Sequence, residues 1–314
     1  MMQEKLSVST SPHVRHYDTT QGIMLDVLIA LMPAAIWGCF IFGWNAILIT
    51  VVSVATAVLS EYLWNLILKK PQTVGDLSAA VTGLLVGMNL STGTPFWVAM
   101  IGSFAAIIVV KQMFGGLGHN FVNPAIGARI ILLVSFPTFM TTFHEPLKYM
   151  TGPIADAVSS ATPIAAKAAG NGTKLFNLFF GLHSGSIGET SAFLLLVGGL
   201  YLVLRKVISP ITPVCFIATV AALTYAFGGD GLYAILSGGV MLGAIFMATD
   251  YVTTPNMPLG KLIFGVGCGI ITFVIRQFGS LPEGVSYSII LMNILTPHIN
   301  NLTKIKPFGW KGGK

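Results

Sequence analysis

Charged side chains are scarce in this chain, at 9% of its 314 residues, whereas soluble domains carry about 25%. Together with 54% hydrophobic residues, this scarcity excludes an ordinary soluble protein and indicates an integral membrane protein. The net charge is +6, but the basic residues form no patch with interleaved aromatic residues. Nucleic acid is therefore not an expected partner.

Cysteine is also rare, and its spacing excludes the usual cysteine-based sites. Cys39, Cys215 and Cys268 lie far apart within apolar stretches, without a C-x-x-C pair. The histidines have no metal-site spacing beyond the His13 and His16 pair, so no metal site is predicted. Without an iron–sulfur cysteine set or a G-x-G-x-x-G nucleotide unit, the chain by itself is expected to have no dehydrogenase activity.

What the chain has in abundance is long apolar runs. About 20 apolar residues cross a bilayer, and the first 20 residues are too polar for a signal peptide. Ten stretches are predicted as spans: 22–42, 45–68, 77–90, 95–111, 123–136, 191–208, 211–227, 231–249, 259–276 and 285–300. The fold expected is therefore an all-α integral membrane protein with about ten transmembrane helices.

A pattern that recurs five spans apart predicts a 5+5 inverted repeat. The run "GDLSAAVTGLLVGMNL" and a span ending "KQMFGG" are echoed by "GDGLYAILSGGVMLGAIFMATD" and a span ending "RQFGSL". Spans 77–90 and 123–136 are too short to cross unbroken, and span 231–249 is rich in glycine. Such broken or half helices point to a substrate or ion path near the midplane. Close helix packing at the glycines is the plainer alternative.

Sidedness follows from the positive-inside rule, with the N-terminus taken as cytoplasmic. The basic residues that then fall inside are Lys5, Arg15, Lys69, Lys70, Lys111, Arg205, Lys206, Lys261, Lys304, Lys306, Lys311 and Lys314, against Lys148, Lys167, Lys174 and Arg276 outside. The segments expected are a cytoplasmic N-terminal segment 1–21, a first repeat 22–136, an extracytoplasmic loop 137–190, a second repeat 191–303 and a cytoplasmic basic tail 304–314.

The extracytoplasmic loop contains a threonine suited to hold a phosphate. In "DAVSSATPIAAKAAG", Thr162 before Pro163 predicts the start of a short helix that ends at Gly170. Free backbone N–H groups at a helix start favour a bound or attached phosphate. From spacing alone, an ordinary cap that carries nothing is the alternative.

Motifs along the chain resemble those of one membrane protein family. The stretches "IMLDVLIALMPA", "NPAIGARIILLVSFP", "SSATP", "GSIGETS" and "MATDYVTTP" are similar to RnfD subunits of the Rnf complex. More distantly they resemble NqrB subunits of the sodium-pumping NADH:quinone oxidoreductase. The resemblance covers about residues 11–303, and the short segment before the first span favours the RnfD type.

The resemblance implies that Thr162 carries covalent FMN through a phosphoester bond, in a motif written D-[GA]-x-S-[GA]-A-T. Here the motif runs from Asp156 through Ser159, Ser160 and Ala161 to the threonine, and Ser160 departs from the expected Gly or Ala. A flavin transferase acting on the outer face would attach the FMN. A second, non-covalent flavin such as riboflavin is compatible with the same family.

By the same resemblance, the chain is a cell-membrane subunit of an ion-translocating ferredoxin:NAD⁺ oxidoreductase that couples electron transfer to Na⁺ or H⁺ transport. Its partners in the bilayer would be RnfA, RnfB, RnfC, RnfE and RnfG. Two alternatives stay open. One is an NqrB-type subunit of a quinone reductase, and the other is a non-redox channel or transporter with Thr162 unmodified.

Ionisable residues within spans are costly and usually functional. Asp26, Glu61, Asp76 and Asp250 are predicted to form a cation entry path at the cytoplasmic ends of their spans. The plainer alternatives are that Asp76 caps its span, that Glu61 pairs with Arg129, and that the other two lie in water at the interface.

The segment "HSGSIGETS" precedes the sixth span and allows two interpretations. In one, Ser186 and Glu189 line the flavin. In the other, the segment caps the span near Ser191.

Overall fold

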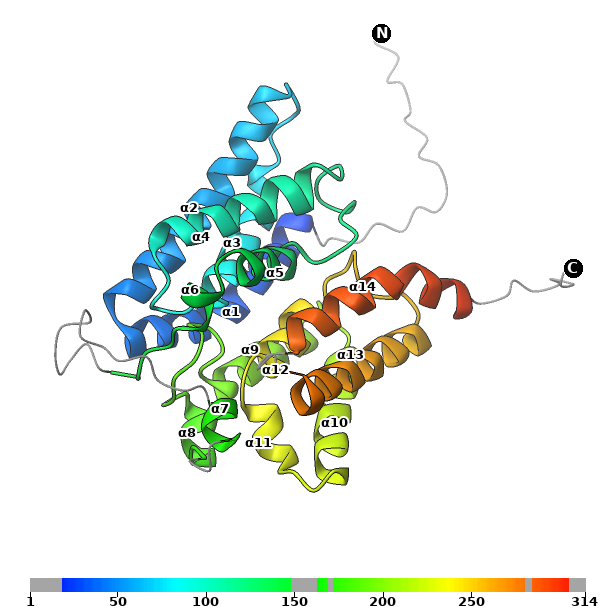
Figure 1. Ribbon diagram of the computed structural model, residues 1–314. Helices are drawn as coiled ribbons and strands as arrows, with labels where there is room; N and C mark the ends of the chain where they lie inside the picture. Colours follow the sequence, from blue (N-terminus) through cyan, green and yellow to red (C-terminus); the bar gives the residue numbers. More distant parts are fainter. Residues whose placement is uncertain (1–18, 148–162, 169–171, 280–283, 305–314) are drawn as a thin grey trace, which may run out of the picture.

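The computed structural model describes residues 19–147, 163–168, 172–279 and 284–304 (Figure 1). Its elements are helical: α1 (Thr20–Phe42), α2 (Trp44–Ile67), η1 (Val74–Asp76), α3 (Ser78–Met88), α4 (Phe96–Phe104), η2 (Ala105–Gln112), α5 (Pro124–Ser135), α6 (Pro137–Thr141), α7 (Pro163–Ala168), α8 (Leu175–Phe180), α9 (Ala192–Leu204), α10 (Ile211–Ala226), α11 (Gly231–Leu236), α12 (Val240–Leu242), η5 (Gly243–Met247), α13 (Pro258–Phe278) and α14 (Val285–Leu302). The expectation of an all-α membrane protein is confirmed.

Each predicted span coincides with a helix or with a broken series of helices. Three helices, α1, α2 and α13, are long and apolar enough to cross a membrane. The two spans predicted to be short are α3, with 11 residues, and α5, with 12. The glycine-rich span is divided into α11, α12 and η5. The inverted relation between the two halves stays a prediction.

Local side chains determine where several helices begin. Thr19 accepts a hydrogen bond from the backbone N–H of Gly22 at the start of α1. Asn123 accepts from the N–H groups of Ala125 and Ile126, and Pro124 occupies the first position of α5. These are the cap residues that satisfy free N–H groups of a first turn. The start of the short helix α5 is therefore fixed by sequence at a point well inside the apolar region.

The outer surface of the helices is apolar, as expected for contact with lipid. Phe40 is 59% exposed, Val134 is 72% exposed and Leu204 is 72% exposed. Lipid tails are as apolar as a protein core, so helix association depends on close packing and polar contacts more than on removal of apolar area from solvent. Buried polar residues in this fold therefore carry unusual weight.

The helices of each half pack mainly among themselves (Figure 1). In the first half α2 packs along α3 and α4, and in the second half α10 packs along α13. Contact between α1 and α9 joins the halves. Fully buried residues on both sides of this junction include Leu31, Ile126 and Phe216.

The segment between the two halves lies against the helix ends. In Figure 1, α7 and α8 lie beside α11. The Trp37 indole donates to the backbone oxygen of Phe180 at 2.8 Å, and the Tyr233 hydroxyl donates to that of Pro163 at 2.7 Å. The predicted helix after Thr162 is confirmed as α7, which begins at Pro163. The threonine itself lies outside the described residues.

Candidate functional site

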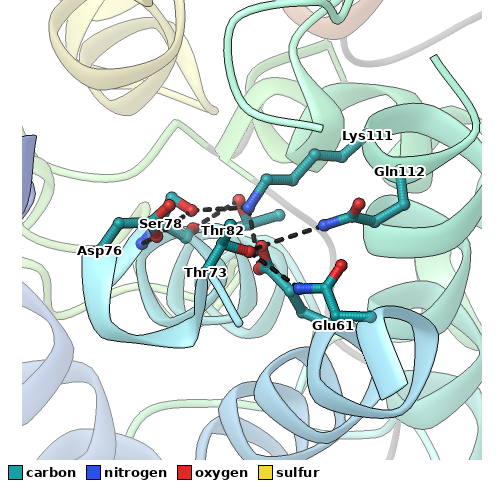
Figure 2. A network of polar contacts seen from close by, with 8 residues as sticks. Glu61, Thr73, Asp76, Ser78, Thr82, Lys111 and Gln112 are labelled. Carbon is teal, nitrogen blue, oxygen red and sulfur yellow. Dashed lines mark hydrogen bonds and ion pairs between the residues drawn. The ribbon is translucent and has the colours of Figure 1, made fainter. Parts of the chain in front are cut away.

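A buried polar network surrounds the ammonium of Lys111 near the start of α3 (Figure 2). Lys111 Nζ lies 2.9 Å from Glu61 Oε2, and the two side chains are 2% and 1% exposed. It also donates to Ser78 Oγ at 2.6 Å. Glu61 Oε1 accepts further hydrogen bonds from Gln112 at 3.0 Å and Thr73 at 2.7 Å. A carboxylate and an ammonium are thus held away from solvent with their hydrogen bonds largely satisfied.

Asp76 joins this network through Ser78. Its Oδ1 accepts from the Ser78 backbone N–H at 2.8 Å and from the Ser78 hydroxyl at 2.5 Å. The carboxylate therefore stabilises the first turn of α3, as the capping alternative predicted, and the same serine connects it to Lys111 (Figure 2). Capping and participation in a charged network are combined in one residue.

The suggested pairing of Glu61 with Arg129 is wrong. Glu61 on α2 faces η2, the π-helical stretch that carries Lys111, and pairs with that lysine. Arg129 on α5 pairs with Glu189 instead. The reason is packing, because η2 lies along α2 whereas α5 packs against α3.

An inner cavity of about 90 Å³ lies beside this network. Ser78 and Lys111 line it from one side, and Asn120 and Asp250 line it from another. Asp250 Oδ2 accepts from Thr253 at 3.0 Å and from Asn120 at 3.5 Å. Burial raises the pKa of Asp250, although these hydrogen bonds oppose the change. Within the described part of the chain, Asp250 forms no ion pair, so its charge faces the cavity uncompensated.

Asp26 is separate from the Lys111 network. Its Oδ1 accepts from the Tyr201 hydroxyl at 2.7 Å, and its Oδ2 lies 3.1 Å from Nη2 of Arg205, a side chain that is 59% exposed. This is a surface ion pair between α1 and α9. The four predicted carboxylates are therefore not one cluster: Glu61 and Asp76 share a network, Asp250 borders the same cavity, and Asp26 lies apart.

A second buried ion pair lies where α3 ends. Arg129 Nη1 contacts Glu189 Oε1, and both side chains are almost fully buried. The same nitrogen donates to the side-chain oxygen of Asn89, the residue after α3. The guanidinium thus occupies the C-terminal end of a half helix, where in transporters a cation is often coordinated.

Two glycines between α11 and α12 allow this pair to approach the broken span. A Cβ on Gly239 would lie 2.6 Å from Glu189 Oε1. The preceding residue, Gly238, has a φ of +65°, which favours glycine. The break in this span is therefore fitted to the Arg129–Glu189 pair.

An outer cavity of about 240 Å³ lies between α7, α10, α11 and α13. Its lining includes Lys167, Asp230, Tyr233, Phe273 and Arg276. Lys167 Nζ lies 4.2 Å from the centre of the Tyr233 ring, a cation–π contact. The cavity combines aromatic walls with two cations, and the first residue of its lining, Ile164, is two positions after Thr162.

The two cavities lie toward opposite ends of α13. Lys261, near its start, lines a hollow next to Asp250, while Arg276, in its last turn, lines the outer cavity. A helix of 21 residues is about 31 Å long, close to the thickness of a bilayer core. Most of the length of a membrane-spanning helix therefore separates the two polar sites.

The remaining predicted residues are placed unevenly. Asp156, Ser159, Ser160, Ala161 and Thr162 lie outside the described residues. Ser186 is buried at 2% exposure and Glu189 at 4%, and neither lines the outer cavity. Ser191 does cap α9, because its Oγ accepts from the N–H of Leu194.

Four residues that the sequence analysis did not single out for a site prove central. Charge counting treats Lys111 only as a cytoplasmic charge and Arg276 only as an extracytoplasmic one. Asn89 and Tyr233 are polar residues within predicted spans, which was an available signal. Nothing in their spacing indicates which partners they meet, because those partners are far away in sequence.

Comparisons with known proteins agree with this architecture. The family model described as NQR2, RnfD, RnfE family matches residues 7–309. The chain is 45% identical to the RnfD-type subunit of the Na⁺-translocating ferredoxin:NAD⁺ oxidoreductase complex of Acetobacterium woodii, over 98% of this chain and 97% of that protein. It is 42% identical to the proton-translocating counterpart of Clostridium ljungdahlii, over 96% of each chain. With a match along nearly its whole length, the chain belongs to the NQR2, RnfD, RnfE family.

Proposed function

We propose that the chain is the RnfD subunit of an ion-translocating ferredoxin:NAD⁺ oxidoreductase complex in the cell membrane, and that it carries FMN covalently on Thr162. Membership of the family and the names of its relatives support the role in the complex. The observation that carries the flavin assignment is the outer cavity, whose wall includes residues of α7 directly after the attachment motif.

The residues around that cavity fit a tethered flavin. Tyr233 and Phe273 provide aromatic surface, and Lys167 and Arg276 provide positive charge for a phosphorylated cofactor. The Tyr233 hydroxyl donates to the carbonyl of Pro163, which holds the chain next to Thr162 against the cavity. When bound, FMN supplies the electron-transfer chemistry, and the protein positions it and tunes its charge environment.

The inner cavity is the proposed entry of the transported cation. Asp250 offers an uncompensated carboxylate there, and Glu61 and Asp76 bring two more close to Lys111. Oxygen atoms of this kind are the ligands that hard cations prefer, and H⁺ can use the same carboxylates. Asp26, paired with Arg205, would act at the edge of the path.

Sidedness in this proposal follows the charge distribution. The inner cavity, Lys111 and both termini lie on the cytoplasmic side, and the outer cavity and the 137–190 loop lie outside. The opposite placement of the two cavities along α13 supports this arrangement. RnfA, RnfB, RnfC, RnfE and RnfG would complete the complex, and a flavin transferase would load Thr162. The proposal does not require a second flavin.

Intact-mass measurement tests the flavin assignment. The chain is purified after expression with its own flavin transferase, alongside Thr162→Ala and a neighbouring control, Thr173→Ala. Wild type and Thr173→Ala are expected to carry the mass of one FMN phosphoester, and Thr162→Ala to carry none while still inserting into membranes. An unmodified wild-type mass in the presence of active transferase would end the assignment.

A further inference from the structure

We propose that Arg276 is a positioning residue for the flavin, holding it in the outer cavity and, with Lys167, raising its reduction potential. This inference rests on the proposed attachment at Thr162. It assigns a docking place and a tuning role to residues that family membership does not identify.

The guanidinium of Arg276 is held in a fixed position beside the cavity. Its Nη1 donates to the backbone oxygen of Ala234 at 2.7 Å, and its Nη2 donates to that of Ser237 at 3.1 Å. Both acceptors are at the end of α11. Because two carbonyl groups orient the planar fork, the charge lines the cavity wall and does not swing into solvent.

The chain leaves space for this guanidinium at Gly238. A Cβ there would lie 2.8 Å from Arg276 Nη2 and 3.0 Å from Cδ1 of Ile164 on α7. The positive φ of +65° at the same residue is a second reason for glycine. The break between α11 and α12 is thus shaped to bring Arg276 against the segment that follows Thr162.

Tyr233 fixes that segment over the cavity from the other side. Its hydroxyl donates to the Pro163 carbonyl at 2.7 Å and accepts from the N–H of Thr173 at 3.3 Å. The Cα atoms of consecutive residues are about 3.8 Å apart, so Thr162 adjoins this anchored position. A group on its side chain can therefore enter the cavity without crossing the loop.

The charge balance of the cavity favours electrons. Its charged lining residues are Lys167, Arg276 and Asp230. The Asp230 carboxylate is engaged at the start of α11, where it accepts from the N–H groups of Leu232 at 3.1 Å and Tyr233 at 3.2 Å. Two cations therefore remain to interact with a ligand that becomes more negative on reduction, in surroundings where charges are poorly screened.

The test is redox titration of the flavin in the purified complex, after intact mass has shown that each variant carries it. Arg276→Gln and Lys167→Gln are expected to lower the midpoint potential, and Lys174→Gln, an exposed loop lysine outside the cavity, is not. A tenfold loss of preference for the reduced form equals about 30 mV for a two-electron couple. Arg276→Lys should restore part of the shift.

A second measurement tests docking without removing charge. Ala234→Phe should fill the cavity, and iodide should then quench the flavin fluorescence more strongly than in wild type. Lys167 is exposed, so Lys167→Gln decides the electrostatic claim if Arg276→Gln does not accumulate. Unchanged potentials in flavin-bearing variants, or a wild-type flavin already open to iodide, would overturn the inference while leaving attachment at Thr162 intact. An unmodified wild-type mass would instead remove both proposals.

Discussion

Breaking the buried Glu61–Lys111 pair should cost far more stability than breaking the exposed Asp26–Arg205 pair. The two pairs have similar N–O distances, 2.9 Å and 3.1 Å. They differ in burial, because Lys111 is 2% exposed and Arg205 is 59% exposed. Substituting Lys111→Met and Arg205→Met removes one cation from each setting and isolates the effect of environment.

The magnitude follows from the charge left behind. Removing one partner of a buried pair costs about 3–5 kcal/mol. Lys111→Met should fall near the lower end, because Gln112 and Thr73 still donate to Glu61. Glu61→Gln should fall near the upper end, because the Lys111 ammonium keeps mainly Ser78. Arg205→Met should cost about 1 kcal/mol or less.

The double variant Glu61→Gln/Lys111→Met distinguishes an ion pair from two separate contributions. It leaves no buried charge, so its total cost should be only about 2 kcal/mol, below that of either single variant. Unfolding of the purified chain by SDS titration in mixed micelles gives the free-energy differences. Strictly additive single effects, or equal costs for Lys111→Met and Arg205→Met, would refute the reasoning.

Three further predictions concern the cavities and the broken span. Burial raises the pKa of Asp250, so it takes up a proton at a higher pH than an ordinary carboxyl. Ion uptake into vesicles should therefore fall as pH is lowered through that pKa, while Asp250→Asn should be slow and insensitive over the same range. Gly239→Ala places a Cβ 2.6 Å from Glu189 Oε1 and should cost about 1–3 kcal/mol in SDS unfolding, whereas Gly75→Ala, whose Cβ meets nothing within 4 Å, should cost little. Tyr233→Phe removes the hydrogen bond to Pro163, and limited proteolysis should then cut the 163–173 segment faster than in a Tyr225→Phe control.

Hydropathy predicted the spans well because membrane thickness constrains helix length directly. The starts of α5 and α7 were also predictable, since Asn123, Pro124 and Pro163 act within one turn of their own helix. The division of span 231–249 was indicated by its glycines, but the place of the break was not. That place depends on Glu189 and Arg276, which contact Gly239 and Gly238 from distant parts of the chain.

The pairing of charges was not predictable in the same way. Charge counting treats a lysine at the end of an apolar run as exposed to the cytoplasm, yet Lys111 turns inward because η2 packs along α2 and presents it to Glu61. These residues are 50 positions apart. Only helix packing selects Lys111 over Arg129 as the partner of Glu61, because Arg129 lies on α5 and meets Glu189.

The most direct measurement of the central claim, that the flavin cavity and the cation cavity lie on opposite sides of the membrane, is sided labelling with a membrane-impermeant thiol reagent. Single cysteines replace the exposed residues Lys167 and His119 in a chain whose native cysteines are changed to alanine. The account predicts that position 167 reacts only from outside and position 119 only from the cytoplasm. Labelling of both positions from the same side would contradict it.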